Sequence, residues 1–276
     1  SPIPANEICM LLAKNKENTF MIEVTQKKLI NTLLDIGEAM LDSGAEVLRV
    51  EDTINRIGYA YQVKRMDVFA ITSCINISME FEDGSSLTQV RRFRKMNGTD
   101  LKKLEAINAL SRDVCNNPLS TDELAHRVEE IIQKRKKKIK MFAGYILAAS
   151  AFAIFFGGNI YDGIAAGIVG ALVCALQIFI SPFFLNEVIS QGIISFVTGF
   201  SVAFISTVLP GLNQAEIMIG VIMLLVPGVA FTNSLRDILL GDTLSGILRM
   251  IEALLLAGTL AIGIIVSFWL CARCFS

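Results

Sequence analysis

The residues best suited to chemistry lie in one stretch at positions 224–252, which reads LLVPGVAFTNSLRDILLGDTLSGILRMIE. Pro227 and Gly228 interrupt an otherwise apolar segment there. Proline removes a backbone donor and clashes with the preceding turn, so the pair predicts a kinked or broken helix. In a membrane, freed backbone groups are tolerated where they are buried in protein or line a wet cavity. Transporters bind ions and substrates at such breaks, although a purely structural kink fits the pattern equally well.

Polar and ionisable side chains follow this interruption closely. They are Asn233, Arg236, Asp237, Asp242, Arg249 and Glu252. An arginine guanidinium matches the two oxygens of a carboxylate, so Arg236 and Arg249 are candidate binding groups for a carboxylate-bearing ligand. Asp237 or Glu252 could take up protons, because ionisable groups that border a membrane span usually face a partner or a water-filled path. The alternative is a cytoplasmic loop with ordinary surface pairs, such as Arg249 with Glu252 on one helix face.

A second charged group lies near the start of the chain, on a helix predicted to end near residue 61. Its members are Glu46, Arg49, Glu51 and Asp52. Glu46 and Glu51 flank the apolar stripe of this helix, whereas Arg49 and Asp52 lie with Arg56 on the opposite side. We interpret the Arg49, Asp52 and Arg56 side as a solvated surface or as a docking or gating surface.

No cofactor or metal site is expected. The sequence has no glycine-rich phosphate loop, so ATP is not supported as a direct power source. Cys271 and Cys274 form a lone CxxC pair with no second pair and no nearby histidine, which is weak evidence for a metal. The single histidine, His126, is predicted to be an exposed residue on a polar helix.

The composition divides the chain into two unlike halves. Hydrophobic residues make up 53% of the 276 residues, compared with roughly 45–50% in a typical soluble domain. Nearly all lysine and arginine residues precede residue 141, and the remainder is close to continuous apolar sequence. We therefore predict a cytosolic domain at residues 1–138 and a transmembrane helical domain at residues 139–276.

The membrane half contains five apolar segments. They run approximately over residues 141–156, 163–180, 188–209, 217–231 and 250–270. A helix needs about 20 residues to cross the hydrocarbon core, so the second, third and fifth segments fit well, and the first and fourth are short. Small residues such as Gly163 and Gly167 predict close helix packing. Asp162, Asn186 and Glu187 border these segments, and we interpret them as loop residues at the membrane interface.

The charge distribution predicts the orientation. The basic run KRKKKIK, at residues 134–140, directly precedes the first segment, and basic residues near a membrane end stay cytoplasmic. With five crossings, the loops at 157–162 and 210–216 lie outside, and neither contains a lysine or arginine. We therefore expect a cytosolic N-terminus and a C-terminus outside.

Hydrophobic periodicity predicts an α+β cytosolic domain, in which helix pairs surround a small antiparallel sheet. Helices are expected approximately over residues 26–42, 43–61, 100–114 and 121–134. Ser43 and Glu46 have the spacing of a capping box that would open the second helix. Apolar and polar residues alternate from Ile75 to Glu82, which predicts a half-buried strand. Asp83-Gly84 then predicts a hairpin with a returning strand over residues 87–93.

Two stretches resemble a known family. SGAEVLRVEDTINRIGYAY, at residues 43–61, is similar to the cytosolic signature of the threonine/serine exporter (ThrE-like) family, and VPGVAFTNSLRDILLGDTLSGILR, at residues 226–249, is similar to its membrane signature. The resemblance implies a secondary exporter in the bacterial cytoplasmic membrane that moves small amino acids or a dicarboxylate such as succinate. The positions that match the signatures include Glu46, Arg49, Glu51, Asp52, Pro227, Gly228, Arg236, Asp237, Gly241, Asp242 and Arg249.

With about five spans, the chain resembles the split type of this family, which implies a second, smaller membrane subunit. The leading hypothesis is therefore a non-enzymatic transporter subunit in a lipid bilayer, driven by protons and acting on a small carboxylate or amino-acid substrate. A regulatory or scaffold subunit is one alternative, and a membrane-anchored enzyme that uses the acidic residues between Glu46 and Asp52 is another. A homo-oligomer is left open, and no nucleic-acid partner is expected.

Overall fold

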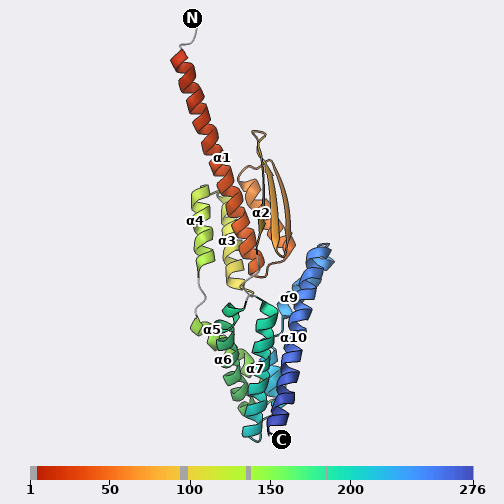
Figure 1. The fold of residues 1–276 in the computed structure, drawn as a ribbon. Coiled ribbons are helices and arrows are strands. Elements are labelled where there is room, and N and C mark those ends of the chain that lie inside the picture. Colours follow the sequence, from red (N-terminus) through yellow and green to blue (C-terminus); the bar gives the residue numbers. More distant parts are fainter. Residues whose placement is uncertain (1–4, 94–98, 135–137, 185, 276) are drawn as a thin grey trace. The chain divides into compact units, whose positions relative to one another are not determined.

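The fold is that of a computed structural model (Figure 1). The structure describes residues 5–93, 99–134, 138–184 and 186–275. The contacts divide the chain into two compact units. The sheet unit combines Ser1–Lys134 with Asn233–Leu248, and the helical unit combines Arg135–Thr232 with Arg249–Ser276. A domain boundary at residue 138 stays a prediction.

The sheet unit contains the expected helices and a three-stranded sheet. Its elements are α1 (Ala5–Asp42), α2 (Val47–Ala60), β1 (Arg65–Ile71), β2 (Cys74–Glu80), β3 (Ser86–Arg92), α3 (Leu101–Asn116) and α4 (Thr121–Gln133). The apolar face predicted for the first helix is confirmed, because Leu29, Leu33, Ile36 and Met40 are all buried. This face of α1 and the inner face of α2 form one core with the sheet.

The predicted capping box before α2 is wrong. Glu46 is the N-cap residue, but its side chain makes no capping hydrogen bond. Ser43 directly follows α1 and closes its end, because its backbone N–H donates to the Ala39 carbonyl at 3.1 Å. A residue that ends one helix lies too early in the chain to cap the next helix, which begins at Val47. The Glu46 carboxylate is therefore available for another contact.

The sheet is antiparallel in the order β1-β2-β3, with Ile77 paired to Val68 on one side and Gln89 on the other. The alternation predicted for β2 is confirmed: Ile75, Ile77 and Met79 are fully buried. The predicted hairpin is also present, and Gly84 in its turn has a φ of 79°.

Polar contacts also join β3 to α1. The Gln89 side-chain amide donates to Asn31 Oδ1 at 2.9 Å. Arg91 pairs with Asp35, and its Nη1 lies 3.6 Å from a Glu38 carboxylate oxygen. The edge strand is thus attached to α1 by hydrogen bonds as well as by the apolar core.

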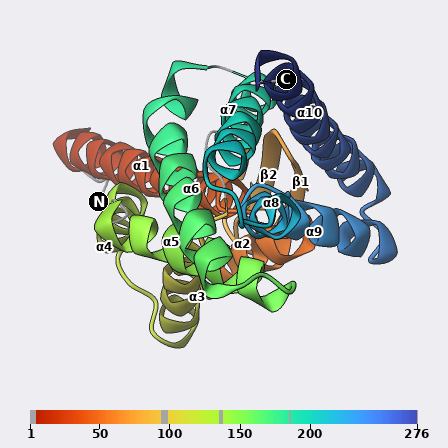
Figure 2. The same ribbon diagram turned by 90° about the horizontal axis from the view of Figure 1, so that it is seen from below.

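The helical unit is built around a short central helix. Its elements are α5 (Lys138–Phe155), α6 (Ile160–Phe179), the 3-10 turn η1 (Ser181–Phe183), α7 (Glu187–Val208) and α8 (Gln214–Ile222). The first turn of α9 (Gly228–Leu239) and most of α10 (Thr243–Phe275) also belong to it. Figure 2 shows α8 among α5, α6 and α7, and α8 contacts all three.

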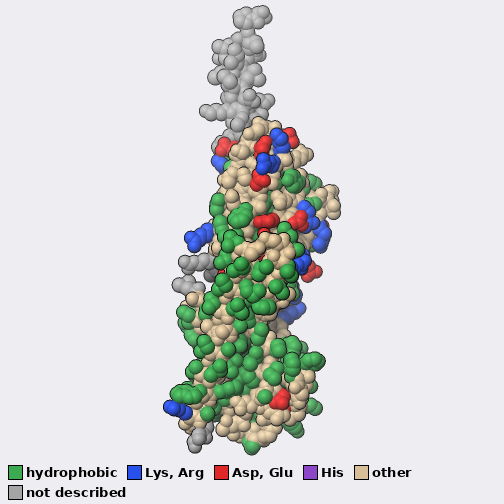
Figure 3. Space-filling model, turned by 90° about the vertical axis from the view of Figure 1, so that its right-hand side faces the viewer, with side chains coloured by type: hydrophobic (Ala, Val, Ile, Leu, Met, Phe, Trp, Pro, Cys, Tyr) green, Lys and Arg blue, Asp and Glu red, His purple; other side chains and the backbone are tan. Residues whose placement is uncertain are grey.

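Three helices of the described chain are long and apolar enough to cross a membrane: Ile160–Phe179, Glu187–Val208 and Thr243–Cys274. A shorter apolar helix covers Ile139–Phe155. Large apolar side chains such as Ile168 and Ile262 are exposed on these helices, and hydrophobic side chains gather over the helical unit on the face in Figure 3. Such a surface suits a hydrocarbon environment better than water. Five spans remain a prediction.

Asp162 is a structural residue in the first turn of α6, which corrects its interpretation as an interfacial loop residue. Its side chain is fully buried. Its carboxylate accepts hydrogen bonds from the Asn159 backbone at 2.8 Å, the Asn213 backbone at 2.8 Å and the Asn213 amide at 3.1 Å. It therefore ties the start of α6 to the start of α8.

Replacing this carboxylate should destabilise the helical unit. Asp162→Ala leaves three donors without their acceptor, and a buried unsatisfied group costs about 1–3 kcal/mol. We expect the thermal unfolding midpoint of the detergent-solubilised chain to fall by several degrees. Glu187→Ala is the matched control, because Glu187 is an exposed acid in the first turn of α7. Equal midpoints for the two variants would contradict this role of Asp162.

Candidate functional site

The predicted helix break is confirmed. Helix α8 ends at Ile222 and α9 begins at Gly228, with Pro227 in the intervening turn. Backbone hydrogen bonds inside the turn include Leu225 N–H to the Ile222 carbonyl at 2.8 Å. Pro227 cannot donate, and the chain therefore leaves its helical path here.

Gln191 supports this break, and the sequence reasoning missed it. It lies in the first turns of α7, and its side-chain amide donates to the Leu225 carbonyl at 3.0 Å. A carbonyl freed by a helix break in an apolar bundle needs such a donor. The available signal was a lone glutamine inside an apolar span, which could have been matched to the predicted break.

Two polar residues of α9 contact the segment that precedes α2. The Asn233 side-chain amide donates to the Gly44 carbonyl at 2.9 Å. Arg236 Nη1 donates to Glu46 Oε1 at 2.7 Å. These contacts join positions about 190 residues apart and connect the two signature stretches within the sheet unit. We call Gly44, Glu46, Asn233 and Arg236 the signature junction.

Gly44 gives the signature junction its backbone shape. Its φ is 88°, which lies in the left-handed region that glycine adopts without steric cost. A Cβ atom at this position would also lie 3.3 Å from Thr99 Oγ1. This conformation follows the end of α1 and orients the Gly44 carbonyl so that it accepts the hydrogen bond from the Asn233 side-chain amide.

The turn between α9 and α10 holds the next acidic residue. Gly241 in this turn has a φ of 103°. The Asp242 backbone N–H then donates to the Asp237 carbonyl at 2.9 Å. Gly246 lets α10 approach α9 closely, because a Cβ there would lie 2.8 Å from the Ile238 nitrogen and 2.9 Å from the Ser234 carbonyl. Asp237 is fully buried.

Glu51 and Asp242 form the electrostatically strained part of the site. Glu51 accepts a hydrogen bond from the Ala70 backbone N–H at 2.8 Å. Burial raises the pKa of Glu51, the Ala70 hydrogen bond lowers it, and repulsion from Asp242 raises it further. One Asp242 carboxylate oxygen is buried and has no hydrogen-bond partner among the described residues. Protonation of Glu51 would remove the cost of burying its charge and its repulsion with Asp242.

The remaining predicted site residues lie elsewhere. Arg49 is exposed, and the Asp52 carboxylate pairs with Arg56 Nη2 at 2.7 Å on the exposed side of α2. Within the helical unit, Arg249 is buried and Glu252 is exposed on α10. His126 is exposed as predicted.

The arrangement offers groups that are suited to binding an anion and a proton. Arg236 is 62% exposed, whereas its partner Glu46 is 15% exposed. A guanidinium has five donors, and the bond to Glu46 uses one of them. An exposed guanidinium of this kind has the chemistry that suits a further carboxylate. Within the described parts of the chain, no group of three or more His, Cys, Asp and Glu side chains could hold a metal ion.

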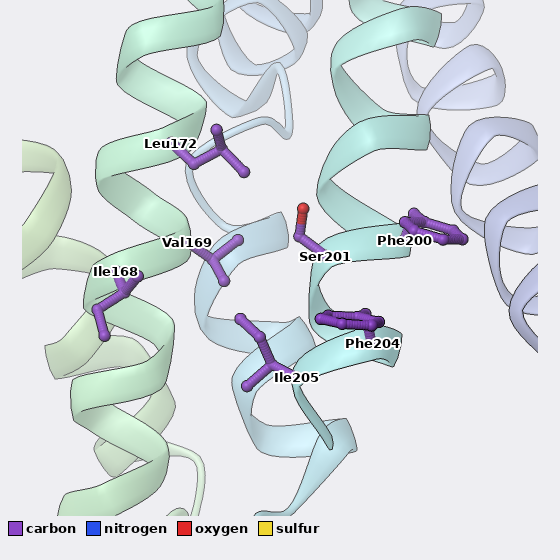
Figure 4. Close-up of a pocket in the computed structure, with 7 residues that line it drawn as sticks. All are labelled: Ile168, Val169, Leu172, Phe200, Ser201, Phe204 and Ile205. Carbon is purple, nitrogen blue, oxygen red and sulfur yellow. The ribbon is translucent and has the colours of Figure 1, made fainter. Parts of the chain in front are cut away.

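A separate groove lies between α6 and α7 (Figure 4). It has a volume of about 280 Å³ and is lined by Ile168, Val169, Leu172, Phe200, Ser201, Phe204 and Ile205. Its one hydroxyl, on Ser201, donates to the Val197 carbonyl at 2.8 Å. The groove is apolar and contains none of the predicted site residues.

Comparison with known proteins gives a family match over most of the chain. The model of the family described as "Putative threonine/serine exporter" matches residues 31–270. This range contains both signature stretches and every residue of the signature junction. No solved structure matches the chain.

Two relatives show how the match extends to longer proteins. A "Probable threonine/serine exporter" of Mycobacterium tuberculosis is 22% identical over 248 residues, covering 87% of this chain and 46% of the relative. "Pheromone-regulated membrane protein 10" of Debaryomyces hansenii is 24% identical over 242 residues, covering 84% of this chain and 23% of the relative. The chain thus spans less than half the length of these relatives.

The raised pKa of Glu51 predicts a pH-dependent stability. Below the ordinary glutamate pKa of 4.5, Glu51 is protonated in both folded and unfolded chains. As the pH rises through the raised folded pKa, ionisation costs more in the folded chain, and stability falls. Glu51→Gln keeps an acceptor for Ala70 but cannot ionise. We expect its unfolding midpoint to exceed that of the unsubstituted chain at pH 7 and to match it near pH 4.

Glu51→Ala separates the charge from the hydrogen bond. It removes the acceptor, which should make it less stable than Glu51→Gln by about 1 kcal/mol at every pH, since neither variant ionises at position 51. A Glu51→Gln midpoint that follows the unsubstituted chain from pH 4 to pH 7 would show that the carboxylate ionises without penalty.

Proposed function

Because the chain belongs to the threonine/serine exporter family, we propose that it is one subunit of a secondary exporter for small carboxylate-bearing metabolites. Membership of this family supports the proposal that the chain is part of a membrane transporter. The finer proposal is that threonine, serine or a dicarboxylate such as succinate is moved out of the cell. The observation that carries it is the contact between Arg236 and Glu46.

Arg236 is the proposed binding group for the carboxylate of the substrate. Glu46 already supplies a carboxylate oxygen to its guanidinium at 2.7 Å, so the pair has the chemistry that a substrate carboxylate would need. Because the guanidinium is exposed, a substrate carboxylate could replace the Glu46 carboxylate as its partner. Displacement of Glu46 would leave α9 attached to the segment before α2 through the bond from Asn233 to Gly44.

Glu51, Asp237 and Asp242 are the proposed proton-handling residues. Glu51 has a raised pKa, and burial is its largest cause. An acid whose ionisation costs free energy has a raised pKa and binds a proton more readily at neutral pH. A proton bound here would reduce the negative charge close to the carboxylate-binding Arg236, which couples proton uptake to anion binding.

Five crossings are proposed: α5, α6, α7, the broken pair α8–α9, and α10. Helix α8 has 9 residues, or about 13 Å at 1.5 Å per residue, which is too short to cross alone. The stretch from Gln214 to Thr232, which ends at the boundary of the helical unit, would measure roughly 28 Å as a continuous helix. A segment of this length suits a crossing that ends shortly before Asn233.

Because basic residues near a membrane end stay cytoplasmic, we propose that the N-terminus and the α9–α10 turn lie in the cytosol and the C-terminus lies outside. We propose the bacterial cytoplasmic membrane as the location. We also propose a second, smaller membrane subunit as the partner, as in the split type of the family.

Export from cells that express the chain with its candidate partner tests the proposal. Cells loaded with a threonine- or serine-containing dipeptide, and separately with succinate, should release product over time. Arg236→Gln should lower the efflux rate about tenfold or more, because a charge-assisted hydrogen bond contributes about 1.5–3 kcal/mol. Arg236→Lys should be intermediate, since it keeps the charge but loses the planar fork.

Arg56→Gln is the matched control. It removes an arginine that is also exposed and paired with an acid, but lies on α2 away from the signature junction. We expect efflux at the level of the unsubstituted chain. If Arg236→Gln and Arg56→Gln export equally well, carboxylate binding by Arg236 is wrong, and a regulatory or scaffold role gains support.

Asp237→Asn tests proton handling separately. It removes a fully buried carboxyl while retaining its size, so efflux driven by a proton gradient should largely vanish. Efflux should be followed with the gradient intact and after its collapse by a protonophore. Gradient-dependent efflux in Asp237→Asn at the original rate would rule this residue out as a proton carrier.

A further inference from the structure

Helix α7 carries a polar face inside the helical unit. Gln191, Ser195 and Thr198 are spaced by four and three residues, which places them on one side of the helix. Ser195 and Thr198 are fully buried. Gln191 and Thr198 are two turns apart, about 10 Å along the axis. This face is distinct from the groove of Figure 4, which Ser201 lines.

Two of the three side chains use their hydrogen bonds within the protein. Gln191 donates to the Leu225 carbonyl at the helix break at 3.0 Å. Ser195 Oγ donates to the Gly192 carbonyl at 2.9 Å. Thr198 Oγ1 differs, because it is buried and has no hydrogen-bond partner among the residues that the structure describes.

Other hydroxyls on the same helix make a local hydrogen bond that Thr198 lacks. Ser201, Ser206 and Thr207 donate to the carbonyl four residues earlier at 2.8, 3.0 and 2.8 Å. This local bond is the ordinary way to satisfy a hydroxyl in an apolar helix. A valine would fill the same space as Thr198 without burying an unsatisfied donor. The Thr198 hydroxyl therefore has no role in packing that valine could not fill.

The electrostatics of this region restrict the ligand. After Glu187, no charged side chain occurs in α7 up to Val208, and none follows Asp162 in α6 up to Phe179. An ion with net charge would find no counter-charge on these helices and would pay a large desolvation cost. A small hydrogen-bonding solute without net charge, such as a zwitterion, avoids most of that cost.

We propose that Thr198 Oγ1 is a ligand-binding group on the transport route and hydrogen-bonds a small zwitterionic solute. Gln191 is a positioning residue, since it holds the broken segment beside the same face of α7. The inference rests on the proposed export function and adds a binding group inside the helical unit to the carboxylate-binding Arg236.

Thr198→Val in the full chain, with its candidate partner present, tests the hydroxyl. The thermal unfolding midpoint should stay the same or rise, because a buried donor without a partner is removed. Efflux of threonine should fall about tenfold, while Thr198→Ser should retain it. Thr207→Val is the matched control, because the Thr207 hydroxyl is bonded to its own helix and this residue is exposed. Thr198→Val efflux equal to that of Thr207→Val would overturn the proposal.

A labelling experiment tests the same residue without relying on export. Thr198→Cys, in a chain whose six native cysteines are replaced, should react with a small water-soluble methanethiosulfonate, and threonine should slow the reaction. Val173→Cys is the control, because Val173 is a fully buried core residue of α6. If neither variant reacts, Thr198 is dry packing. If Thr198→Cys alone reacts and threonine protects it while no export occurs, the binding group stands and the export function fails.

Discussion

The interruption at Pro227 is the constraint on which the helical unit depends. A chain that breaks its helix inside an apolar bundle must find new partners for the backbone groups it frees. The Gln191 amide meets this need by binding the Leu225 carbonyl. At the other end of α8, Asp162 holds Asn213 through backbone and side-chain bonds. The short helix is thus held at both ends, and α9 can start in a new direction.

The polar residues of α9 belong to the sheet unit, which includes Asn233–Leu248. There the two signature stretches meet through Asn233 and Arg236. Opposite charges are satisfied at Arg236, whereas like charges oppose each other at Glu51 and Asp242. One short region therefore combines the favourable ion pair of Arg236 and Glu46 with the unfavourable repulsion between Glu51 and Asp242. Protonation of Glu51 reduces this repulsion and leaves the ion pair in place.

Local patterns predicted local structure well. The period of Leu29, Leu33 and Ile36 gave the buried face of α1, and the alternation around Ile77 gave the central strand. The break at Pro227 followed from the chemistry of one residue. Contacts between distant positions could not be predicted in this way. Hydrophobic periodicity says nothing about which distant residues meet, so it could not predict the contact between Arg236 and Glu46. The capping-box pattern also assigned Glu46 to a different role.

Buried polar residues explain most of what the sequence reasoning missed. Asp162, Gln191 and Thr198 each look like an ordinary polar residue in or beside an apolar segment, and their importance depends on the partner that each one meets. Asp162 meets three donors, Gln191 meets a freed carbonyl, and Thr198 meets no acceptor in the described chain. Since burying a polar group without a partner is costly, the first two residues fit a fixed framework, whereas the buried hydroxyl of the third is the one that we propose a ligand completes.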